Sequence, residues 1–473
     1  MTKGRPKVAI LSIEEHEGPL EGVSLIADHS SNIDCGHVQE TIGLGAIGLA
    51  LTGLLAALYF AAGRTGMCPV TVSPTMIHGQ VAPGFEGVEA EFRKNFAERG
   101  ECGATVTVYY RGSKVVDLWG GYRDPKSEAQ WDEDTMEIVF STTKGMSAIV
   151  LAMLNSRGYL DYDERMATYW PEFAQNGKGN ITVRQLISHQ AGLAALDEPL
   201  DYSTLADLDK MAQILARQRP EWEPGTRSGY HAVTLGFYEN ELVRRTDPQH
   251  RSIGRFFAEE VAVPLGIEFY IGLPKDVPLS RIGTLEVNSN KLAWVVGTVK
   301  ENPKALRMVL AFMNPGSLTS RVLNSPLMVQ GADFANPACR GVEFAAHGGI
   351  GQARAIARAY SALAVGGGEL GITPKTMAAL KAPAVAPTGG ERDLVLGMEL
   401  KHSLGFGKPT ANLKFGSSDS AFGWPGAGGS FGFADPDAQI GFGYVMNRMG
   451  TSFTADARAM SLMDAVYRSI AKR

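Results

Sequence analysis

The sequence predicts an α+β domain in which an antiparallel sheet is built from both ends of the domain, with flanking helices and a mostly helical inserted subdomain, preceded by one transmembrane helix. Three observations carry this prediction. Strand-like alternation occurs at 103–122 and 428–449, and the middle, roughly 141–260, has the apolar spacing of helices. The segment 41–63 has no charged residue. The 473 residues are 44% hydrophobic and 20% charged, which is typical of a chain that buries a large core.

The first segment, residues 1–40, has three basic and seven acidic residues and little apolar periodicity. Such a composition buries too little apolar surface to offset the entropy of ordering. We therefore expect a disordered acidic tail at residues 1–40.

The next segment, 41–63, is the predicted transmembrane helix. As a helix its 23 residues would span about 34 Å, enough to cross a hydrocarbon core of roughly 30 Å. A cleaved signal peptide would begin earlier and have a shorter apolar run. A buried core helix is the alternative, but a soluble helix of this length normally has a polar face, and here only Thr52 interrupts the apolar surface.

We interpret segment 41–63 as a single-pass membrane anchor. The basic residues around it favour neither orientation and indicate no particular membrane. Small residues along the segment would let such helices pack closely and so permit an oligomer: Gly45, Gly48, Gly53 and Ala57.

A proline-containing linker, 64–84, is predicted to lead into a domain at 85–473. The domain begins with helical spacing at 85–100, which ends in glycine, and closes with an amphipathic helix at 454–473. The strand pairs inside these helices are predicted to turn at Arg111–Lys114 and at Asp435–Asp437.

Charge and cysteine content exclude several classes of function. The 45 basic and 50 acidic residues give a net charge of −5, so a basic nucleic-acid footprint is absent and we expect no nucleic-acid partner. The four cysteines are too few for a disulfide framework and form no CxxC pair. No histidine or carboxylate cluster has metal-site spacing, so we expect neither a metal nor a cofactor.

The most informative motif is Ser141-Thr142-Thr143-Lys144, which opens a helical run. Residues three apart share a helix face, so the Lys144 amine can approach the Ser141 hydroxyl. The helix N-terminus favours a developing oxyanion, and a lysine with a depressed pKa can act as a general base. The alternative is an N-cap serine beside a solvated lysine. A second Ser-x-x-Lys match at 469–472 lies at the chain end and is attributed to chance.

Three other stretches give this motif a context. They are Thr182–Leu193, Trp222–Ala232 with a tyrosine five residues after a Pro-Gly turn, and Gly423–Gly429, which leads into a strand. In their order and spacing, these stretches and the Ser-x-x-Lys motif resemble the serine beta-lactamase-like family, in particular its class C-like branch of family VIII carboxylesterases and peptidases. The resemblance covers roughly residues 85–470 and implies a beta-lactamase/transpeptidase-like fold.

The resemblance also implies catalytic roles. Ser141 would be the nucleophile, Lys144 the base that activates it, and Tyr230 a second proton-transfer group. The backbone N–H groups of Ser141 and Ala427 would form the oxyanion hole. The family's second motif is usually Tyr-x-Asn, whereas this chain has alanine at the third position. A strict match at 238–240 lies in a helical pattern without the Pro-Gly approach, so we prefer Tyr230.

The expected substrate contacts are Trp424, Gly426 and His231. Beta-lactamases and penicillin-binding proteins have at the position of Trp424 a lysine that pairs with the substrate carboxylate. Tryptophan offers an apolar wall instead, which favours neutral or apolar acyl groups over anionic β-lactams. The alternatives are that Trp424 only packs in the sheet and that His231, like His189, has a structural hydrogen-bonding role. His347 is expected to border the cleft.

A competing motif, Gly428–Gly432, matches the G-x-S-x-G nucleophile elbow of α/β-hydrolases, and His347-Gly348-Gly349 looks like a lipase oxyanion loop. That fold needs its catalytic histidine after the serine, but the last histidine in the chain is His402. The residues after Ser430 also alternate like a strand. We therefore reject the elbow.

The sequence thus predicts a membrane-anchored serine hydrolase that cleaves small-molecule esters of neutral or apolar acyl groups through a Ser-Lys-Tyr acyl-enzyme mechanism. Two alternatives stay open: a peptidase or amidase of the same family, and a non-catalytic membrane-associated scaffold or filament-forming protein.

Overall fold

The computed structural model describes residues 70–287, 305–323, 336–451 and 456–472, together with residues 68, 295, 298 and 299. The predicted tail at 1–40 and the predicted transmembrane helix at 41–63 lie outside these residues. Within the described ranges, no helix is both long and apolar enough to cross a membrane.

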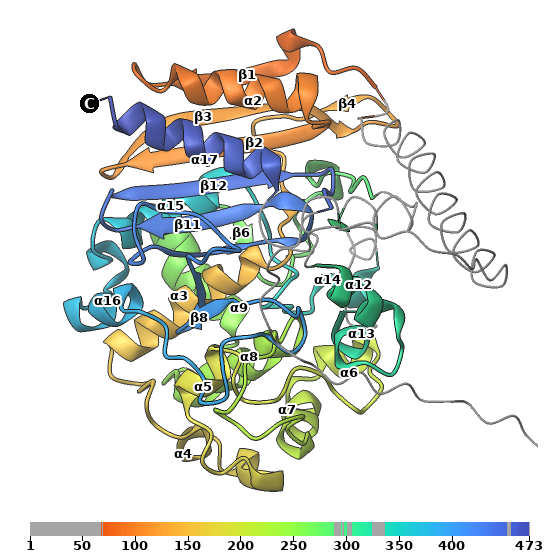
Figure 1. Ribbon diagram of the computed structural model, residues 1–473, viewed down its shortest axis with the longest axis vertical. Coiled ribbons are helices and arrows are strands. Elements are labelled where there is room, and N and C mark those ends of the chain that lie inside the picture. The colour runs from red at the N-terminus through yellow and green to blue at the C-terminus, as the bar shows by residue number, and fades with distance from the viewer. Residues whose placement is uncertain are drawn as a thin grey trace, which may run out of the picture. The chain divides into compact units, whose positions relative to one another are not determined.

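The described chain contains an antiparallel sheet of nine strands, most of which lie in the upper half of Figure 1. Its strands run in the order β1-β3-β2-β12-β11-β10-β9-β8, and β4 pairs with β3 beside this path. The strand bounds are β1 Ile77–Val81, β2 Gly103–Tyr110, β3 Ser113–Asp124, β4 Ala129–Gln130, β8 Lys401–Ser403, β9 Phe406–Lys408, β10 Phe422–Pro425, β11 Phe431–Asp435 and β12 Ile440–Met446. Because β2 pairs directly with β12, the sheet joins both ends of the domain, as predicted.

Both predicted hairpins are present. The loop between β2 and β3 consists of Arg111 and Gly112, each with positive φ (50° and 78°), which is the backbone of a two-residue turn that matches strand twist. Between β11 and β12, the Asp435 carboxylate accepts hydrogen bonds from the N–H groups of Asp437 and Ala438. These hydrogen bonds fix the second turn at the position predicted from the sequence.

Part of the predicted linker belongs to the sheet. Residues 77–81 form the edge strand β1, which pairs with β3, and Cys68 is joined by a disulfide to Cys102 just before β2. The sheet therefore begins before residue 85, where the sequence had suggested that the domain starts. A five-residue strand next to two prolines is a weak pattern, and its pairing depends on a partner far along the chain.

Two helical layers cover the sheet. Helices α2 (Glu86–Glu98) and α17 (Ala457–Ile470) pack together on one face, and α15 (Ala353–Ala364) packs on the other. Strand β12 shows why: Phe442 and Tyr444 face the core under α2 and α17, whereas the alternate residues Gly441 and Gly443 lie under α15. A Cβ at either glycine would overlap the α15 backbone, so the glycines permit close packing.

The middle of the chain is mostly helical, as predicted, and lies below the sheet in Figure 1. Its helices are α3 Thr142–Ser156, α4 Met166–Tyr169, α5 Val183–Ile187, α6 Tyr202–Ala206, α7 Leu208–Arg217, α8 Thr234–Thr246, α9 Ile253–Phe257 and α10 Val263–Leu265, with a π-helical segment at Ala258–Ala262 between the last two. The first turns of α5, α6, α7 and α9 are capped by Thr182, Asp201, Asp207 and Ser252.

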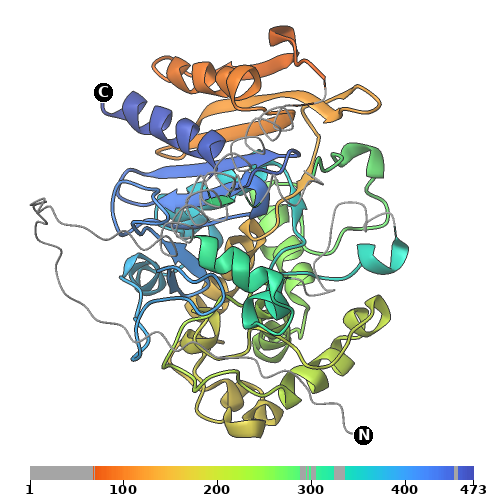
Figure 2. The same cartoon turned by 45° about the vertical axis from the view of Figure 1, so that its right-hand side comes forward.

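Shorter elements complete the described chain. A small sheet has the order β5-β7-β6, with bounds Glu137–Ile138, Ile350–Gly351 and Phe269–Tyr270. The remaining helices are α12 Leu306–Met313, α13 Leu318–Leu323, α14 Pro337–Arg340 and α16 Pro374–Lys381. In Figure 2, the green helices of residues 305–323 lie between the blue strands and the yellow helices of the insertion.

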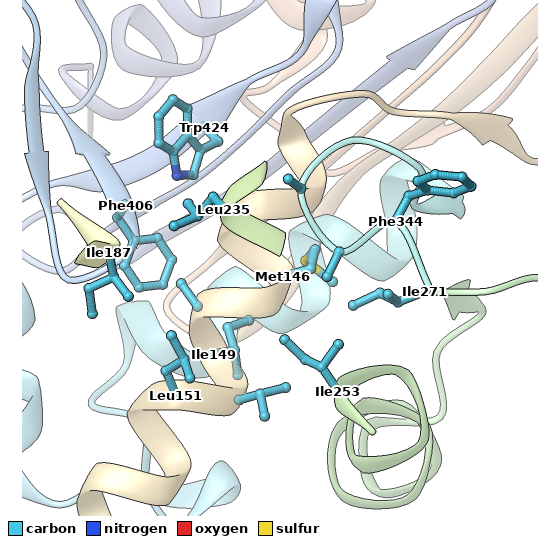
Figure 3. Packing of buried hydrophobic residues seen from close by; sticks show 14 of the residues in the cluster. Met146, Ile149, Leu151, Ile187, Leu235, Ile253, Ile271, Phe344, Phe406 and Trp424 are labelled. Carbon is cyan, nitrogen blue, oxygen red and sulfur yellow. The ribbon is translucent and has the colours of Figure 1, made fainter. Parts of the chain in front are cut away.

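Helix α3 holds the residues of the site in position. It runs through the largest hydrophobic cluster, with Met146, Ile149 and Leu151 packed among side chains from other elements, and Trp424 lies near its N-terminus (Figure 3). Every residue from Thr142 to Leu154 is buried. A helix buried on all sides can hold its first turn in one position. That turn contains the predicted base and directly follows the predicted nucleophile.

Candidate active site

Ser141 lies immediately before α3, at the end of a strained turn. The preceding residue, Phe140, has a φ of 43°, a conformation that a bulky side chain rarely adopts. The Phe140 carbonyl accepts hydrogen bonds from both the backbone N–H and the hydroxyl of Thr143, and the Val139 N–H donates to Gly349. These bonds hold the turn against its strain and direct Ser141 into a cavity.

Lys144 follows one turn later and is completely buried. Its Nζ lies 3.5 Å from the Ser141 Oγ and donates to the carbonyls of Ala232 at 2.7 Å and Ala346 at 2.9 Å. Burial lowers the pKa of Lys144 to about 7, and the charge of Glu239 opposes this shift. A substantial fraction of the amine is therefore neutral at neutral pH.

Tyr230 reaches Ser141 from the other side. Its hydroxyl forms a short hydrogen bond with the Ser141 hydroxyl, and its ring lies 4.7 Å from the Lys144 Nζ. Burial raises the pKa of Tyr230 well above its ordinary value, while the hydrogen bond with Ser141 opposes this shift, so the phenol keeps its proton. The structure thus brings Ser141, Lys144 and Tyr230 together as expected.

The departure from Tyr-x-Asn has a structural explanation. At the third position, Ala232 contributes its backbone carbonyl to Lys144 rather than a side chain. The alternative match, 238–240, lies inside α8, where the Tyr238 hydroxyl donates to the Leu215 carbonyl and Asn240 accepts from the Ile253 N–H. Those residues hold the helical insertion together and do not line the cavity.

Ala427 lies two residues after the end of β10 and begins the short turn Ala427–Gly429. Both Ser141 and Ala427 line the same cavity. The assignment of their backbone N–H groups as the oxyanion hole stays a prediction.

Gly426 has a different role from the one expected. It does not line the cavity, and its N–H donates to the Ser430 carbonyl at 2.7 Å. A Cβ at this position would overlap Ser430 Oγ and Val139 O. Gly426 therefore lets the end of β10 lie against the turn before Ser141, which is a packing role.

The serine of the rejected elbow motif is also structural. Ser430 donates to the Val139 carbonyl at 2.8 Å and lies 3.1 Å from the Thr142 hydroxyl. A strand, β11, follows it instead of a helix. Ser430 is 1% exposed and fixes the strand against the Ser141 turn.

The cavity in front of Ser141 has a volume of about 180 Å³ and mostly apolar walls. Trp424 forms one wall, and its indole N–H donates to the Gly405 carbonyl at 2.5 Å. His347 lines the cavity as expected. The other lining residues are Phe140, Tyr230, Ala232, Phe312, Leu323, Leu396, Leu400, Lys401, His402, Leu413, Pro425 and Ala427.

His231, expected to contact substrate, is completely buried and does not line the cavity. Its Nε2 accepts a hydrogen bond from the Leu193 N–H, and its Nδ1 lies 2.6 Å from the Gly229 carbonyl. Both ring nitrogens are therefore occupied by backbone, and burial lowers the pKa of His231 to about 4. His231 therefore has the structural hydrogen-bonding role that was the alternative prediction. The same is true of His189, whose Nδ1 accepts a hydrogen bond from the His231 N–H.

Sequence reasoning missed several residues of the site, including His402 and Glu239. His402 on β8 lines the cavity, and its ring stacks on Trp424. Glu239 on α8 is completely buried near enough to Lys144 to oppose the fall of its pKa. The strand-like stretch 401–408 before the third motif was the available signal for His402, whereas Glu239 lies in a helical pattern that gives no such signal.

No group of three or more histidine, cysteine or carboxylate side chains that could bind a metal ion occurs in the part of the chain that the structure describes. The chemistry that this geometry supports is nucleophilic attack by an activated serine.

The chain is similar to known proteins in sequence and in fold. Residues 88–466 match the family described as Beta-lactamase. The chain is 31% identical over 377 residues to the esterase/beta-lactamase LipL of Mycobacterium tuberculosis, covering 79% of this chain and 83% of that protein. The crystal structure of a family VIII carboxylesterase is 37% identical, with a TM-score of 0.72 and coverage of 83% and 99%. EstA from Arthrobacter nitroguajacolicus Rue61a is 32% identical, with a TM-score of 0.71 and coverage of 84% and 99%.

Proposed function

The chain belongs to the beta-lactamase family and is a serine hydrolase, and on this basis we propose that it cleaves esters of neutral or apolar acyl groups through an acyl-enzyme on Ser141. The observation that carries the proposal is the juxtaposition of Ser141, Lys144 and Tyr230 at the end of a cavity with mostly apolar walls.

In the proposed first half-reaction, Ser141 Oγ attacks the ester carbonyl carbon and its proton passes to the neutral Lys144 amine. The carbonyl oxygen becomes an oxyanion, which the N–H groups of Ser141 and Ala427 stabilise. The bond between carbon and the alcohol oxygen then breaks. The alcohol leaves with a proton from the Tyr230 hydroxyl, and the proton on Lys144 restores that hydroxyl.

In the second half-reaction, water attacks the acyl-enzyme with the same groups in reversed roles. One proton of the water passes to the base, the acid product leaves, and Ser141 regains its proton. The high pKa of Tyr230 supports its role as a proton donor, because the phenol stays protonated until a developing alkoxide takes the proton.

The acyl preference follows from the cavity walls. Trp424 cannot pair with a carboxylate, and five of the other lining residues are the apolar side chains Phe312, Leu323, Leu396, Leu400 and Leu413. Among the described residues that line this cavity, the cation is Lys401, whose side chain is 46% exposed and lies 4.0 Å from the Glu391 carboxylate. An anionic acyl group would therefore lose hydration without gaining a buried partner.

We also propose that segment 41–63 anchors the protein in a membrane as a single-pass helix, with residues 1–40 on the opposite side from the catalytic domain. The proposal is supported by the 23 consecutive uncharged residues of the segment, which as a helix are long enough to cross a membrane. Carbonate extraction of membranes that contain the full chain tests this: a membrane-spanning chain stays in the pellet, and release into the supernatant would contradict it.

Hydrolysis of p-nitrophenyl acetate, butyrate, hexanoate and decanoate by the wild-type chain tests the catalytic proposal. We expect turnover of these neutral esters and a kcat/KM for butyrate at least about tenfold above that for the matching anionic hemisuccinate ester. Equal or greater turnover of the hemisuccinate would contradict the acyl preference. Cleavage of D-amino-acid p-nitroanilides without ester turnover would favour the peptidase alternative.

A further inference from the structure

We infer that His402 is a second polar contact for the substrate, whose ring N–H binds an oxygen acceptor outside the scissile ester group. The inference rests on the proposed ester hydrolysis and adds a substrate class: esters whose acyl or alcohol part contains an ether, hydroxyl or carbonyl oxygen.

His402 is held rigidly at the cavity wall. It lies on β8, is 5% exposed, and its ring stacks on Trp424 with centroids 5.1 Å apart and planes 19° apart. The Tyr230 ring lies 6.3 Å away in a nearly parallel plane. Gly407 pairs with His402 across the sheet.

At least one nitrogen of this ring makes no hydrogen bond within the described residues. Nδ1 of His402 is buried and has no hydrogen-bond partner among them, whereas Nε2 is not one of the buried atoms that lack a partner. The His189 ring packs edge-on against it with centroids 4.5 Å apart, but His189 directs its Nδ1 to the His231 N–H. His402 therefore differs from His231, whose two ring nitrogens both meet backbone groups.

The ring is neutral and so has one donor and one acceptor. Burial, together with the charges of Lys144 and His231, lowers the pKa of His402 to about 3. A buried N–H group without an acceptor costs more free energy than a buried acceptor nitrogen without a donor. We therefore place the proton of the neutral ring on Nε2, which leaves the buried Nδ1 as the acceptor. The ring then presents a donor to the cavity that it lines, and a donor selects an oxygen acceptor rather than an amine or a second N–H.

The apolar surroundings make this contact selective. A substrate that fills the cavity without offering an acceptor leaves the N–H unpaired in a dry site, whereas a substrate with a suitably placed oxygen satisfies it. The difference expected for one such hydrogen bond is about tenfold in kcat/KM.

The test compares p-nitrophenyl hexanoate with its ether analogues, in which an oxygen replaces one methylene of the acyl chain, and hexyl acetate with the corresponding alcohol-chain ethers. The readout is the ratio of kcat/KM for each ether to that for its parent. The wild type is measured beside His402→Phe, which keeps an aromatic ring but has no N–H, and His402→Gln, which restores an N–H donor. His78→Phe is the matched control, because His78 is exposed on β1.

We expect at least one ether to have a ratio about tenfold higher in the wild type and in His78→Phe than in His402→Phe, with part of the preference restored in His402→Gln. A general loss of packing in His402→Phe would lower both members of a pair and leave the ratio unchanged. Equal ratios in the wild type and His402→Phe for every ether in both series would overturn the inference. Failure of the proposed function is a separate result, because the wild type would then hydrolyse no parent ester.

Discussion

The Lys144 amine lies 3.5 Å from the Ser141 hydroxyl oxygen and is fixed there by the backbone carbonyls of Ala232 and Ala346. Two carbonyl acceptors match the two N–H bonds of a neutral amine, so the lone pair is left for the Ser141 proton. Because burial lowers the pKa of Lys144 to about 7, this base form is accessible at neutral pH. The geometry and the electrostatics therefore favour the same role.

Replacing Lys144 by methionine tests that role, since methionine keeps an unbranched chain of similar length and removes the amine. We expect kcat/KM for p-nitrophenyl butyrate to fall by about 10³, because a general base contributes 10²–10⁴. Lys178→Met is the matched control: Lys178 is also completely buried and donates to two backbone carbonyls, but it does not line the cavity. An equal loss in both variants would mean that Lys144 matters only for packing.

The pH profile of kcat/KM reports the base directly. The amine must be unprotonated to accept a proton, so activity should rise by about tenfold per pH unit below pH 7 and level off above it. A Lys144 with its ordinary pKa of 10.5 would instead leave the rate rising through pH 9. Initial rates with p-nitrophenyl butyrate, corrected for the pH dependence of p-nitrophenol absorbance, distinguish the two profiles.

Gly145 tests how tightly the first turn of α3 is packed. A Cβ at Gly145 would overlap the Tyr360 hydroxyl, so Gly145→Ala should destabilise the fold by about 1–3 kcal/mol and shift the Ser-Lys turn. Gly87→Ala in α2 is the control, because a Cβ at Gly87 would meet only Ser469 Oγ, at 3.9 Å. This substitution should stabilise the helix by about 0.5–1 kcal/mol. Urea unfolding of both variants gives the comparison, and equal effects would contradict the packing account.

The neutral state of His402 has a consequence for stability. The ordinary pKa of 6.5 falls to about 3 in the folded chain, so below pH 6.5 the unfolded state binds a proton that the folded state does not. Stability is therefore lost as the pH falls, by about 1.4 kcal/mol per pH unit for this one group.

His402→Phe isolates that contribution. Buried acids such as Glu239, whose pKa burial raises to about 8, act in the opposite direction, but they are present in both proteins and cancel in the difference. The unfolding free energy of the wild type relative to His402→Phe should decline steadily between pH 6.5 and 4. A difference that does not change with pH would mean that the ring is charged or exposed in the folded state.

The sequence predicted the parts of the site that local pattern controls. The Ser-x-x-Lys spacing follows from one helical turn, and the two hairpins follow from alternation and turn residues, so these could be placed without long-range information. The preference for Tyr230 over Tyr238 could also be predicted from the sequence, because the helical pattern around Tyr238 indicates a side chain used for packing.

Other features depend on contacts between distant segments. His231 follows Tyr230 directly, yet the backbone of Leu193 and Gly229 determines its orientation. Gly426 was expected at the substrate, but the carbonyl of Val139 and the side chain of Ser430 fill the space beside it. His402 enters the site only because β8 pairs at the edge of a sheet assembled from both ends of the chain.

The most direct test of the central claim is acid-quenched mass spectrometry of the full chain mixed with p-nitrophenyl butyrate, followed by peptide mapping. The account predicts a butyryl adduct on Ser141 that forms in the wild type and is absent in Ser141→Ala and strongly reduced in Lys144→Met. Turnover with the adduct on another residue, such as Ser430, would contradict it, as would unchanged hydrolysis by Ser141→Ala.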